Sequence, residues 1–331
     1  MKAVVCSEYG DISALRVVDL PSPVPGPRQV VVTNHVAGVN FPDTLIVQGK
    51  YQFKPTPPFS PGGELAGVVK QVGSEVRDFK LGDKVMALMT FGAYAQEVLV
   101  DVENLTALPA GLDREALEVA GSCMLTYGTS FHALQDRARA QPGETLLVLG
   151  AAGGVGLAAV ELGKLLGLRV IAAASSPEKL EITRRYGADA TIDYSREDLR
   201  ERAKALTGGR GVDILYDPVG DKLADPALRS VGWNGRYLVV GFAGGEIPRI
   251  ALNLPLLKGC SIVGVFWGEF TRREPRQYAA NTRQLLNWIE EGRIRPLISA
   301  RYPLSGAQQA LQALLARQVA GKSIILPQRP E

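Results

Sequence analysis

The fold of this chain is decided by residues 144–176, which read ETLLVLGAAGGVGLAAVELGKLLGLRVIAAASS. Thr145 to Leu149 is a short apolar run, and such a run predicts a fully buried parallel strand. A glycine cluster follows, and apolar residues then recur at helical spacing. A second apolar run, Val170 to Ala174, comes after the small-residue break at Gly167. The order strand, glycine turn, helix, strand predicts the first βαβ unit of a dinucleotide-binding domain.

The glycines of this turn suit contact with a diphosphate. A turn packed against phosphate has no room for Cβ atoms, and the helix that opens at Gly154 offers free N–H groups and a positive dipole end. The spacing is GxxGxxG, and a glycine-rich turn alone is often only a tight bend. Within a complete βαβ unit it predicts a nucleotide site. The candidate residues of this turn are Gly150, Ala152, Gly153, Gly154, Val155 and Gly156.

The end of the second strand indicates which dinucleotide binds. An NAD site usually places Asp or Glu about 20 residues past the glycines, to bind the ribose hydroxyls. Here the strand ends in Ala174, Ser175 and Ser176, and Lys179 and Tyr194 follow. Hydroxyl groups and a cation suit a 2′-phosphate, which a carboxylate would repel. We therefore expect NADP(H), although Ser176 with the next residue, a proline, also suits the cap and first turn of a helix.

Composition places the chain among globular proteins without a dominant charge. It has 331 residues, enough for two domains, with 37 basic and 34 acidic side chains and a net charge of +3. No apolar run reaches 18 residues, and the first ten residues lack the apolar core of a secretory signal, so we expect no membrane association. The three cysteines are scattered, which favours reduced thiols and a cytoplasmic location.

The hydrophobic pattern changes along the chain. Residues 1 to about 120 show short strand-like runs between Pro- and Gly-rich turns, which predicts a compact barrel or folded sheet. From residue 144 to residue 266 strands and helices alternate, which predicts an α/β domain with a doubly wound parallel sheet of about six strands. The tail carries helical patterns and a closing strand, Ser323 to Leu326, which we place back on the first domain.

With these motifs in order, the chain resembles the zinc-independent quinone oxidoreductase branch of the medium-chain dehydrogenase/reductase superfamily. The resemblance is carried by NFPDTLIVQGKY (40–51), PGGELAGVV (61–69), YGTSFHAL (127–134), AAGGVG (151–156), DPVG (217–220) and GKSIILP (321–327). It implies a GroES-like, β-rich catalytic domain of residues 1–121 and 268–331. It also implies a Rossmann NADP(H)-binding domain of residues 122–267.

The chain departs from the zinc alcohol dehydrogenases of the same superfamily. Those enzymes carry a cysteine where Asn40 stands and a histidine where Gly63 stands, and both bind the catalytic zinc. Their lobe of four closely spaced cysteines is also missing here. His35 and His132, with three distant cysteines, do not make a tetrahedral zinc site at familiar spacing. We therefore expect no metal.

The resemblance also implies the residues of the acceptor pocket, which are Asn40, Asp43 and Tyr51. Asn40 could donate a hydrogen bond to a carbonyl oxygen, and Tyr51 could donate a proton or stack on a ring. The alternative for NFPD is a turn in which Asp43 caps a helix that begins near Thr44. Further cofactor contacts implied by the resemblance are Thr129, Gly241, Phe242, Val265, Phe266 and, near the 2′-phosphate, Arg317.

These expectations together predict an NADPH-dependent, metal-free oxidoreductase acting on quinones or α,β-unsaturated carbonyls. An enoyl- or alkenal-type C=C reductase shares every motif. Some relatives serve as lens crystallins or bind RNA, but the glycine turn argues against a purely structural role. The chain also has no stripe of interleaved basic and aromatic residues, which argues against dedicated nucleic-acid binding. By family analogy, Ser261 to Phe266 forms a sheet edge that pairs with a second copy in a homodimer.

Overall fold

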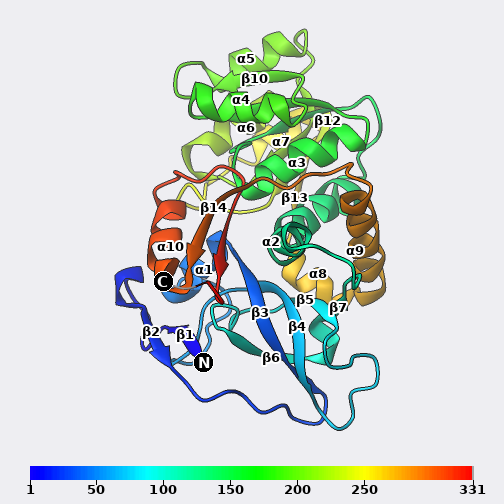
Figure 1. Ribbon diagram of the computed structural model, residues 1–331. Helices are drawn as coiled ribbons and strands as arrows, with labels where there is room; N and C mark the ends of the chain where they lie inside the picture. The colour runs from blue at the N-terminus through cyan, green and yellow to red at the C-terminus, as the bar shows by residue number, and fades with distance from the viewer. Residues whose placement is uncertain (330–331) are drawn as a thin grey trace. The chain divides into compact units, whose positions relative to one another are not determined.

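The computed structural model describes residues 1–329 of the chain (Figure 1). It divides into two compact units, one formed by Met1–Leu125 with Pro296–Glu331 and the other by Thr126–Arg295. No helix within residues 1–329 is long and apolar enough to cross a membrane.

The second unit contains a parallel sheet of six strands in the order β10-β9-β8-β11-β12-β13. The chain enters at β8 in the middle, winds outward to β10, and then returns to add the other three strands. This is the strand order of a Rossmann domain, so the predicted doubly wound sheet is confirmed. The strands are β8 (Thr145–Val148), β9 (Arg169–Ala174), β10 (Ala190–Asp193), β11 (Val212–Asp217), β12 (Val231–Val239) and β13 (Ser261–Gly264).

Helices connect these strands, and the apolar runs identified in the sequence form the core beneath them. All four residues of β8 are buried, as expected for a strand covered on both faces. One core cluster joins Leu147, Ile171 and Leu215 of the sheet to Ala203 of α5 and Leu228 of α6. The helices are α3 (Gly154–Leu165), α4 (Pro177–Arg185), α5 (Leu199–Leu206), η4 (Asp221–Leu223), α6 (Ala224–Ser230) and α7 (Asn253–Lys258).

The first unit is built on an antiparallel-rich sheet of seven strands in the order β14-β15-β3-β4-β5-β7, with β6 also paired to β3. A separate pair, β1 with β2, completes its strands. The strands are β1 (Lys2–Val5), β2 (Arg16–Asp19), β3 (Gln29–Val39), β4 (Glu64–Val72), β5 (Lys84–Leu88), β6 (Glu97–Asp101), β7 (Leu105–Ala107), β14 (Ile298–Pro303) and β15 (Lys322–Leu326).

The C-terminal strand returns to this first sheet, as the sequence predicts. β15 runs antiparallel to β3, with Ser323 opposite Val39 and Ile324 opposite Gly38. This register brings the start of β15 beside the residues that follow β3. The helices of this unit are η1 (Ile12–Ala14), α1 (Phe41–Val47), η2 (Val102–Asn104), η5 (Leu304–Gly306) and α10 (Ala307–Leu315), while α2 (Arg114–Phe131) runs across the boundary between the units.

The boundaries of the compact units differ from the expected ones mainly at residues 268–295. This segment holds most of α8 (Trp267–Arg273) and all of α9 (Pro275–Glu290), and it belongs to the second unit. Aromatic packing holds the segment there. The ring of Phe270 stacks on that of His132, in the π-helical turn η3 (His132–Arg137), with 3.8 Å between the ring centroids. The rings of Trp288 and Phe131 meet edge-on, with 5.4 Å between their centroids. Amphipathic spacing predicts that these helices exist but does not indicate which core they cover.

Candidate active site

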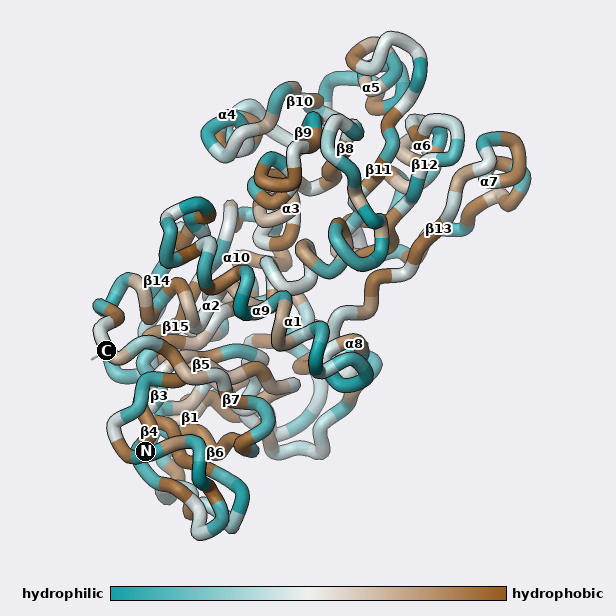
Figure 2. Tube along the Cα trace, turned by 90° about the vertical axis from the view of Figure 1, so that its right-hand side faces the viewer, coloured by the Kyte–Doolittle hydropathy of each residue, from teal (hydrophilic) through white to brown (hydrophobic). Residues whose placement is uncertain are grey.

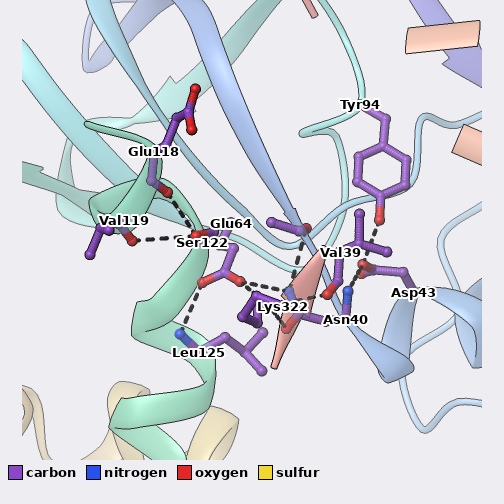
Figure 3. A network of polar contacts seen from close by, with 11 residues as sticks. Val39, Asn40, Asp43, Glu64, Tyr94, Glu118, Val119, Ser122, Leu125 and Lys322 are labelled. Atoms are coloured by element: carbon purple, nitrogen blue, oxygen red, sulfur yellow. Dashed lines mark hydrogen bonds and ion pairs between the residues drawn. The ribbon is translucent and has the colours of Figure 1, made fainter. Parts of the chain in front are cut away.

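A buried polar network lies in the first unit where three chain segments meet (Figure 3). Asn40 follows the end of β3 and precedes α1, Glu64 opens β4, and Lys322 opens β15. The sheet register sets Gly38 opposite Glu64 on one side and Ile324 on the other, so these three polar side chains converge. Asn40, Glu64 and Lys322 are 4%, 1% and 3% exposed, so their polar atoms depend on one another rather than on water.

Lys322 is the centre of the network. Its ammonium donates to Oε1 of Glu64 at 2.9 Å, to Oδ1 of Asn40 at 2.5 Å and to the Val39 carbonyl at 3.1 Å. All three of its protons are therefore used. Glu64 also accepts from Nδ2 of Asn40 at 2.8 Å and from the backbone N–H of Leu125 at 3.0 Å. A buried charge pair with this many hydrogen bonds is costly to break by removing one partner.

Asp43 lies beside this network and has an altered proton affinity. Its Oδ2 accepts from the Asn40 backbone N–H and from the Tyr94 hydroxyl, both at 2.8 Å. Burial raises the pKa of Asp43 to about 7, although the hydrogen bonds from Tyr94 and Asn40 act in the opposite direction. The carboxyl group therefore changes its charge near neutral pH.

The capping alternative for Asp43 is also present in the structure, one turn earlier than expected. Helix α1 begins at Phe41 rather than near Thr44, and Asp43 is the third residue of its first turn. Its carboxylate reaches back to the Asn40 N–H, which precedes the helix. The same side chain thus serves as a helix cap and as a member of the polar cluster.

Tyr51 lies a few residues beyond the end of α1 and is partly buried. Burial, and then the charge of Asp43, raises the pKa of its hydroxyl. The Tyr51 hydroxyl has no hydrogen-bond partner among residues 1–329. It is therefore a neutral donor with its proton available to a ligand.

Sequence reasoning missed three members of this network, namely Glu64, Lys322 and Tyr94. Two of them were visible as charged residues within apolar stretches, PGGELAGVV and GKSIILP. A charge inside a buried strand needs a partner, and that requirement is the signal that was available. The partner itself was not evident, because Glu64 and Lys322 are joined only by strand pairing across the sheet.

In the second unit, the glycine turn forms a cradle that side chains would fill. A Cβ on Gly156 would lie 2.3 Å from the carbonyl oxygen of Gly150, so α3 approaches the turn too closely for any other residue. Gly150 itself has a positive φ of 55°. Gly153 precedes α3 without a side-chain cap, and Gly154 and Val155 open the helix, so its first N–H groups face outward from the turn. These features fit a bound diphosphate.

The loop after β11 supports this turn. Asp217 accepts from the backbone N–H groups of Val219 and Gly220, both at 2.8 Å, and from the Tyr237 hydroxyl at 2.5 Å. A Cβ on Gly150 would meet Val219 at 2.9 Å, so this loop packs directly on the glycine turn. Burial raises the pKa of Asp217. The DPVG motif carries part of the family resemblance, but its anchoring role was not predicted.

The structure brings together three of the four residues expected at the 2′-phosphate. Ser175 follows β9, Tyr194 follows β10, and the Lys179 ammonium lies 3.4 Å from the Ser175 hydroxyl. The Tyr194 N–H bonds the Ala174 carbonyl at 3.1 Å, which joins the two strand ends. Ser176 caps α4, as the alternative reading predicted. Arg317, the fourth residue, lies in the first unit just after α10, and its contact with the cofactor stays a prediction.

The other candidate cofactor residues all lie in the second unit. Gly241 and Phe242 follow β12, Val265 and Phe266 follow β13, and Thr129 is buried on α2. The Val265 N–H bonds the Val239 carbonyl at 2.9 Å, which keeps the ends of β12 and β13 together. The glycine turn, Gly241 and Val265 thus all follow carboxyl ends of parallel strands, the edge where such sheets bind ligands.

Comparison with known proteins shows the family. One family model, the alcohol dehydrogenase GroES-like domain, matches residues 26–110, and another, zinc-binding dehydrogenase, matches residues 154–288. A quinone oxidoreductase-like protein 2 homolog of Nematostella vectensis is 39% identical over 98% of this chain and 88% of its own length. The chain belongs to the quinone oxidoreductase branch of the medium-chain dehydrogenase/reductase superfamily. It is an oxidoreductase.

Two solved structures of the superfamily cover almost the whole oxidoreductase. The Escherichia coli quinone oxidoreductase, complexed with NADPH, is 29% identical and matches 99% of this chain and 100% of its own with a TM-score of 0.91. A 2-haloacrylate reductase is 30% identical over 99% of this chain and 100% of its own, with a TM-score of 0.85. The predicted combination of a GroES-like and a Rossmann domain is confirmed.

Proposed function

We propose that this oxidoreductase is metal-free and uses NADPH to reduce quinones or α,β-unsaturated carbonyls by hydride transfer. The observation that carries the proposal is the bond between Lys322 and Asn40. At a position where zinc alcohol dehydrogenases hold a metal ligand, the side-chain oxygen of Asn40 is bonded to an ammonium group at 2.5 Å. The chemistry of this site therefore rests on hydrogen-bond donors.

The residues around Asn40 do not fit a zinc ion. Zinc sites in catalysis use three protein ligands, and Gly63 supplies no side chain where the zinc enzymes have histidine. A Cβ at Gly63 would already lie 3.0 Å from the Met89 carbonyl. The Glu64 carboxylate is bonded to Lys322, whose positive charge would repel a second cation at this distance. Quinones and conjugated carbonyls need no Lewis acid of this kind, because they accept hydride readily.

NADP(H) is the cofactor that the second unit fits. The cradle of Gly150, Gly153 and Gly156 would hold the diphosphate, and the helix N-terminus of α3 would face it. Ser175, Lys179 and Tyr194 would hold the 2′-phosphate, since they offer hydroxyls and a cation without a carboxylate at the end of β9. Bound NADPH supplies the hydride. The complex of the Escherichia coli relative with NADPH supports this assignment.

The residues of the first unit would act on the acceptor. A conjugated acceptor that gains hydride develops negative charge on its oxygen, and donors placed in advance stabilise that charge. Asn40 offers a second N–H whose only contact among residues 1–329, with the Gly38 carbonyl, is long at 3.5 Å. Tyr51 offers its hydroxyl, which the raised pKa keeps protonated. Asp43 contributes by raising that pKa and by holding the backbone of Asn40.

A second candidate function is reduction of the C=C bond of enoyl or alkenal substrates. The similarity to a solved 2-haloacrylate reductase favours it. Both candidates require the same donors and the same cofactor, and they differ in where the hydride arrives. The two are separated by product analysis, because quinone reduction gives a hydroquinone and C=C reduction gives the saturated carbonyl.

The experiment is to follow NADPH oxidation by the purified protein with a panel of quinones and enals, with a saturated ketone and a primary alcohol as controls. The proposal predicts turnover with at least one conjugated acceptor and none with the saturated ketone. It also predicts no NADP+ reduction with the alcohol. Turnover of the unactivated substrates alone would contradict it, because they need a Lewis acid.

We also propose that the enzyme is a homodimer. β13 is an edge strand of its sheet and pairs only with β12 within residues 1–329. Ile262 on this strand is 41% exposed, and nearby Leu256 of α7 is 78% exposed. Figure 2 shows the α7 trace largely in the colour of hydrophobic residues. An uncovered apolar edge of this kind suits pairing with a second copy about a two-fold axis.

The three cysteines support a reducing, cytoplasmic location, which we also propose. Cys6, Cys123 and Cys260 are all buried, and none of them forms a disulfide among residues 1–329. Cell fractionation tests this location, and recovery of the enzyme in an oxidising compartment would contradict it.

A further inference from the structure

The Asn40 carboxamide lies between two groups that fix which way it faces. Lys322 carries only donors, so it must face the amide oxygen, and this contact measures 2.5 Å. The Glu64 carboxylate, paired with Lys322, offers acceptors, so it faces the amide nitrogen, at 2.8 Å. Turning the amide by 180° would set donor against donor and acceptor against acceptor. The orientation therefore follows from the chemistry of the neighbours and not from a choice between similar atoms.

The network leaves Asn40 with one donor and no acceptor to offer. Its oxygen is occupied by Lys322, and one of its two N–H groups is occupied by Glu64. The other N–H has only the long contact of 3.5 Å with the Gly38 carbonyl. Asn40 can thus meet a ligand as a donor, which is the role that a developing oxyanion needs.

We infer that Lys322 and Glu64 are positioning residues, which hold the Asn40 carboxamide so that its second N–H, only weakly engaged by the Gly38 carbonyl, can donate to the acceptor's oxygen. This inference rests on the proposed function. Neither residue is assigned a contact with substrate. Both act through Asn40, and they do so from strand ends that lie 258 positions apart in the chain.

A purely structural role is separable from this one. Two buried strands are held together as well by apolar side chains as by an ion pair, and replacing a buried pair by neutral residues is often tolerated. Only the ion pair, however, forces one orientation on an amide. A variant that keeps the fold but loses both charges therefore tests whether the charged pair is needed to orient the amide.

The sheet offers a matched control. Lys70 on β4 and Glu97 on β6 form a pair of the same residue types at 2.7 Å. The Lys70 side chain is 38% exposed and that of Glu97 16%, and no residue proposed for the acceptor pocket bonds either of them. The same two substitutions at these positions remove an ion pair from the same sheet and leave Asn40 untouched.

The test compares Glu64→Gln with Lys322→Met against Lys70→Met with Glu97→Gln. Both charges are removed together, because a single change would leave one charge buried and unpaired. Thermal melting shows which variants fold. For a folded Glu64/Lys322 variant we expect kcat with an enal to fall by about tenfold to 100-fold, as displacement of a catalytic group does. We expect unchanged affinity for NADPH, and an unchanged kcat in the control pair. Wild-type kcat in the folded Glu64/Lys322 variant would overturn the inference.

A second measurement does not depend on activity or on the folding of the Glu64/Lys322 variant. The Asn40 side-chain amide signal is identified in ¹⁵N spectra as the one missing from Asn40→Ala. In wild-type protein one of its two protons should exchange slowly with solvent and the other faster, because only one is bonded to Glu64. Fast exchange of both protons would overturn the inference. Absence of turnover by the wild type would refute the proposed function, while this exchange pattern would still decide the orientation.

Discussion

Asp43 is a carboxyl group whose proton affinity is set by burial. Its pKa is about 7 in the folded protein, against an ordinary value of 3.8. At a pH between 3.8 and about 7, Asp43 has lost its proton in the unfolded chain but still holds it in the folded protein. The folded state then binds more protons, so stability falls as pH rises through this window and the loss is complete above about pH 7.

We predict that Asp43→Asn makes stability less dependent on pH. The Asn carbonyl can still accept from Tyr94 and from the Asn40 backbone, whereas it has no proton to lose. Between pH 5 and pH 8 the wild type should lose about 2–3 kcal/mol more than the variant, from roughly 1.4 kcal/mol per unit of pKa difference. Urea unfolding at both pH values measures this. Equal pH dependence in the two proteins would show that Asp43 is ionised throughout.

Asn40 and Tyr51 carry the prediction about chemistry. Asn40→Ala and Tyr51→Phe should each leave the NADPH dissociation constant nearly unchanged, because neither residue lies in the second unit. Loss of a donor to a developed oxyanion typically costs about 2.7–4 kcal/mol in the transition state. Turnover should therefore fall, and more for enals than for the more easily reduced quinones. Tyr302→Phe, at a partly buried tyrosine on β14, is the control. Full turnover of both variants with every acceptor would show that Asn40 and Tyr51 do not act as donors in hydride transfer.

The residues of this site differ in how well the sequence alone predicts them. Asn40, Asp43 and Tyr51 stand in one contiguous motif, and resemblance was enough to select them. Lys322 is visible in the sequence only as a lysine before an apolar strand, and nothing local connects it to Glu64. Its role depends on the register of β15 against β3, which is a property of the folded sheet.

At the scale of elements, the strand–turn–helix–strand segment from β8 to β9 was the most predictable part of the chain. Its signals are local: apolar runs, glycines with no room for Cβ, and helical periodicity. β14 was not predicted, because ISARYP is short and half polar. It forms through parallel pairing with β15, a partner about 20 residues further along the chain.

The ends of β9 and β10 give the prediction for this scale. Lys179→Ala should weaken NADPH binding and leave NADH binding unchanged, because only NADPH carries the 2′-phosphate. A charge-assisted hydrogen bond contributes about 1.5–3 kcal/mol, which corresponds to about tenfold or more in the dissociation constant. Fluorescence titration with both cofactors measures this, with exposed Lys204 of α5 changed to Ala as the control. Equal weakening for both cofactors would remove Lys179 from the phosphate site.

At the scale of the whole molecule, the division into two units was predictable because their hydrophobic patterns differ. One shows short strand-like runs and the other alternating strands and helices. The family resemblance and the α/β alternation both led to a Rossmann unit, and its six-stranded order is confirmed. Residues 268–295 were the exception. Their apolar faces were readable as helical, but the unit they join is set by tertiary contacts such as those of Phe270 and Trp288 with the end of α2 and η3.

The homodimer is tested at the same scale. We expect light scattering to give twice the mass of one chain, and Ile262→Asp to give the mass of a single chain. An aspartate on the exposed edge strand would face its own copy across the two-fold axis, and like charges there are repulsive. Leu81→Asp changes a residue that is 65% exposed in the first unit and should leave the mass unchanged. A wild-type protein that is monomeric at working concentration would contradict the proposal.

The central claim is that hydride transfer here needs donors and no metal, and one measurement addresses it directly. The initial rate of NADPH oxidation with the preferred conjugated acceptor is compared before and after exhaustive dialysis against a chelator, with zinc content determined on the same samples. We predict no stoichiometric zinc in either sample and the same rate in both. A rate that is lost on chelation and restored by added zinc would contradict the account.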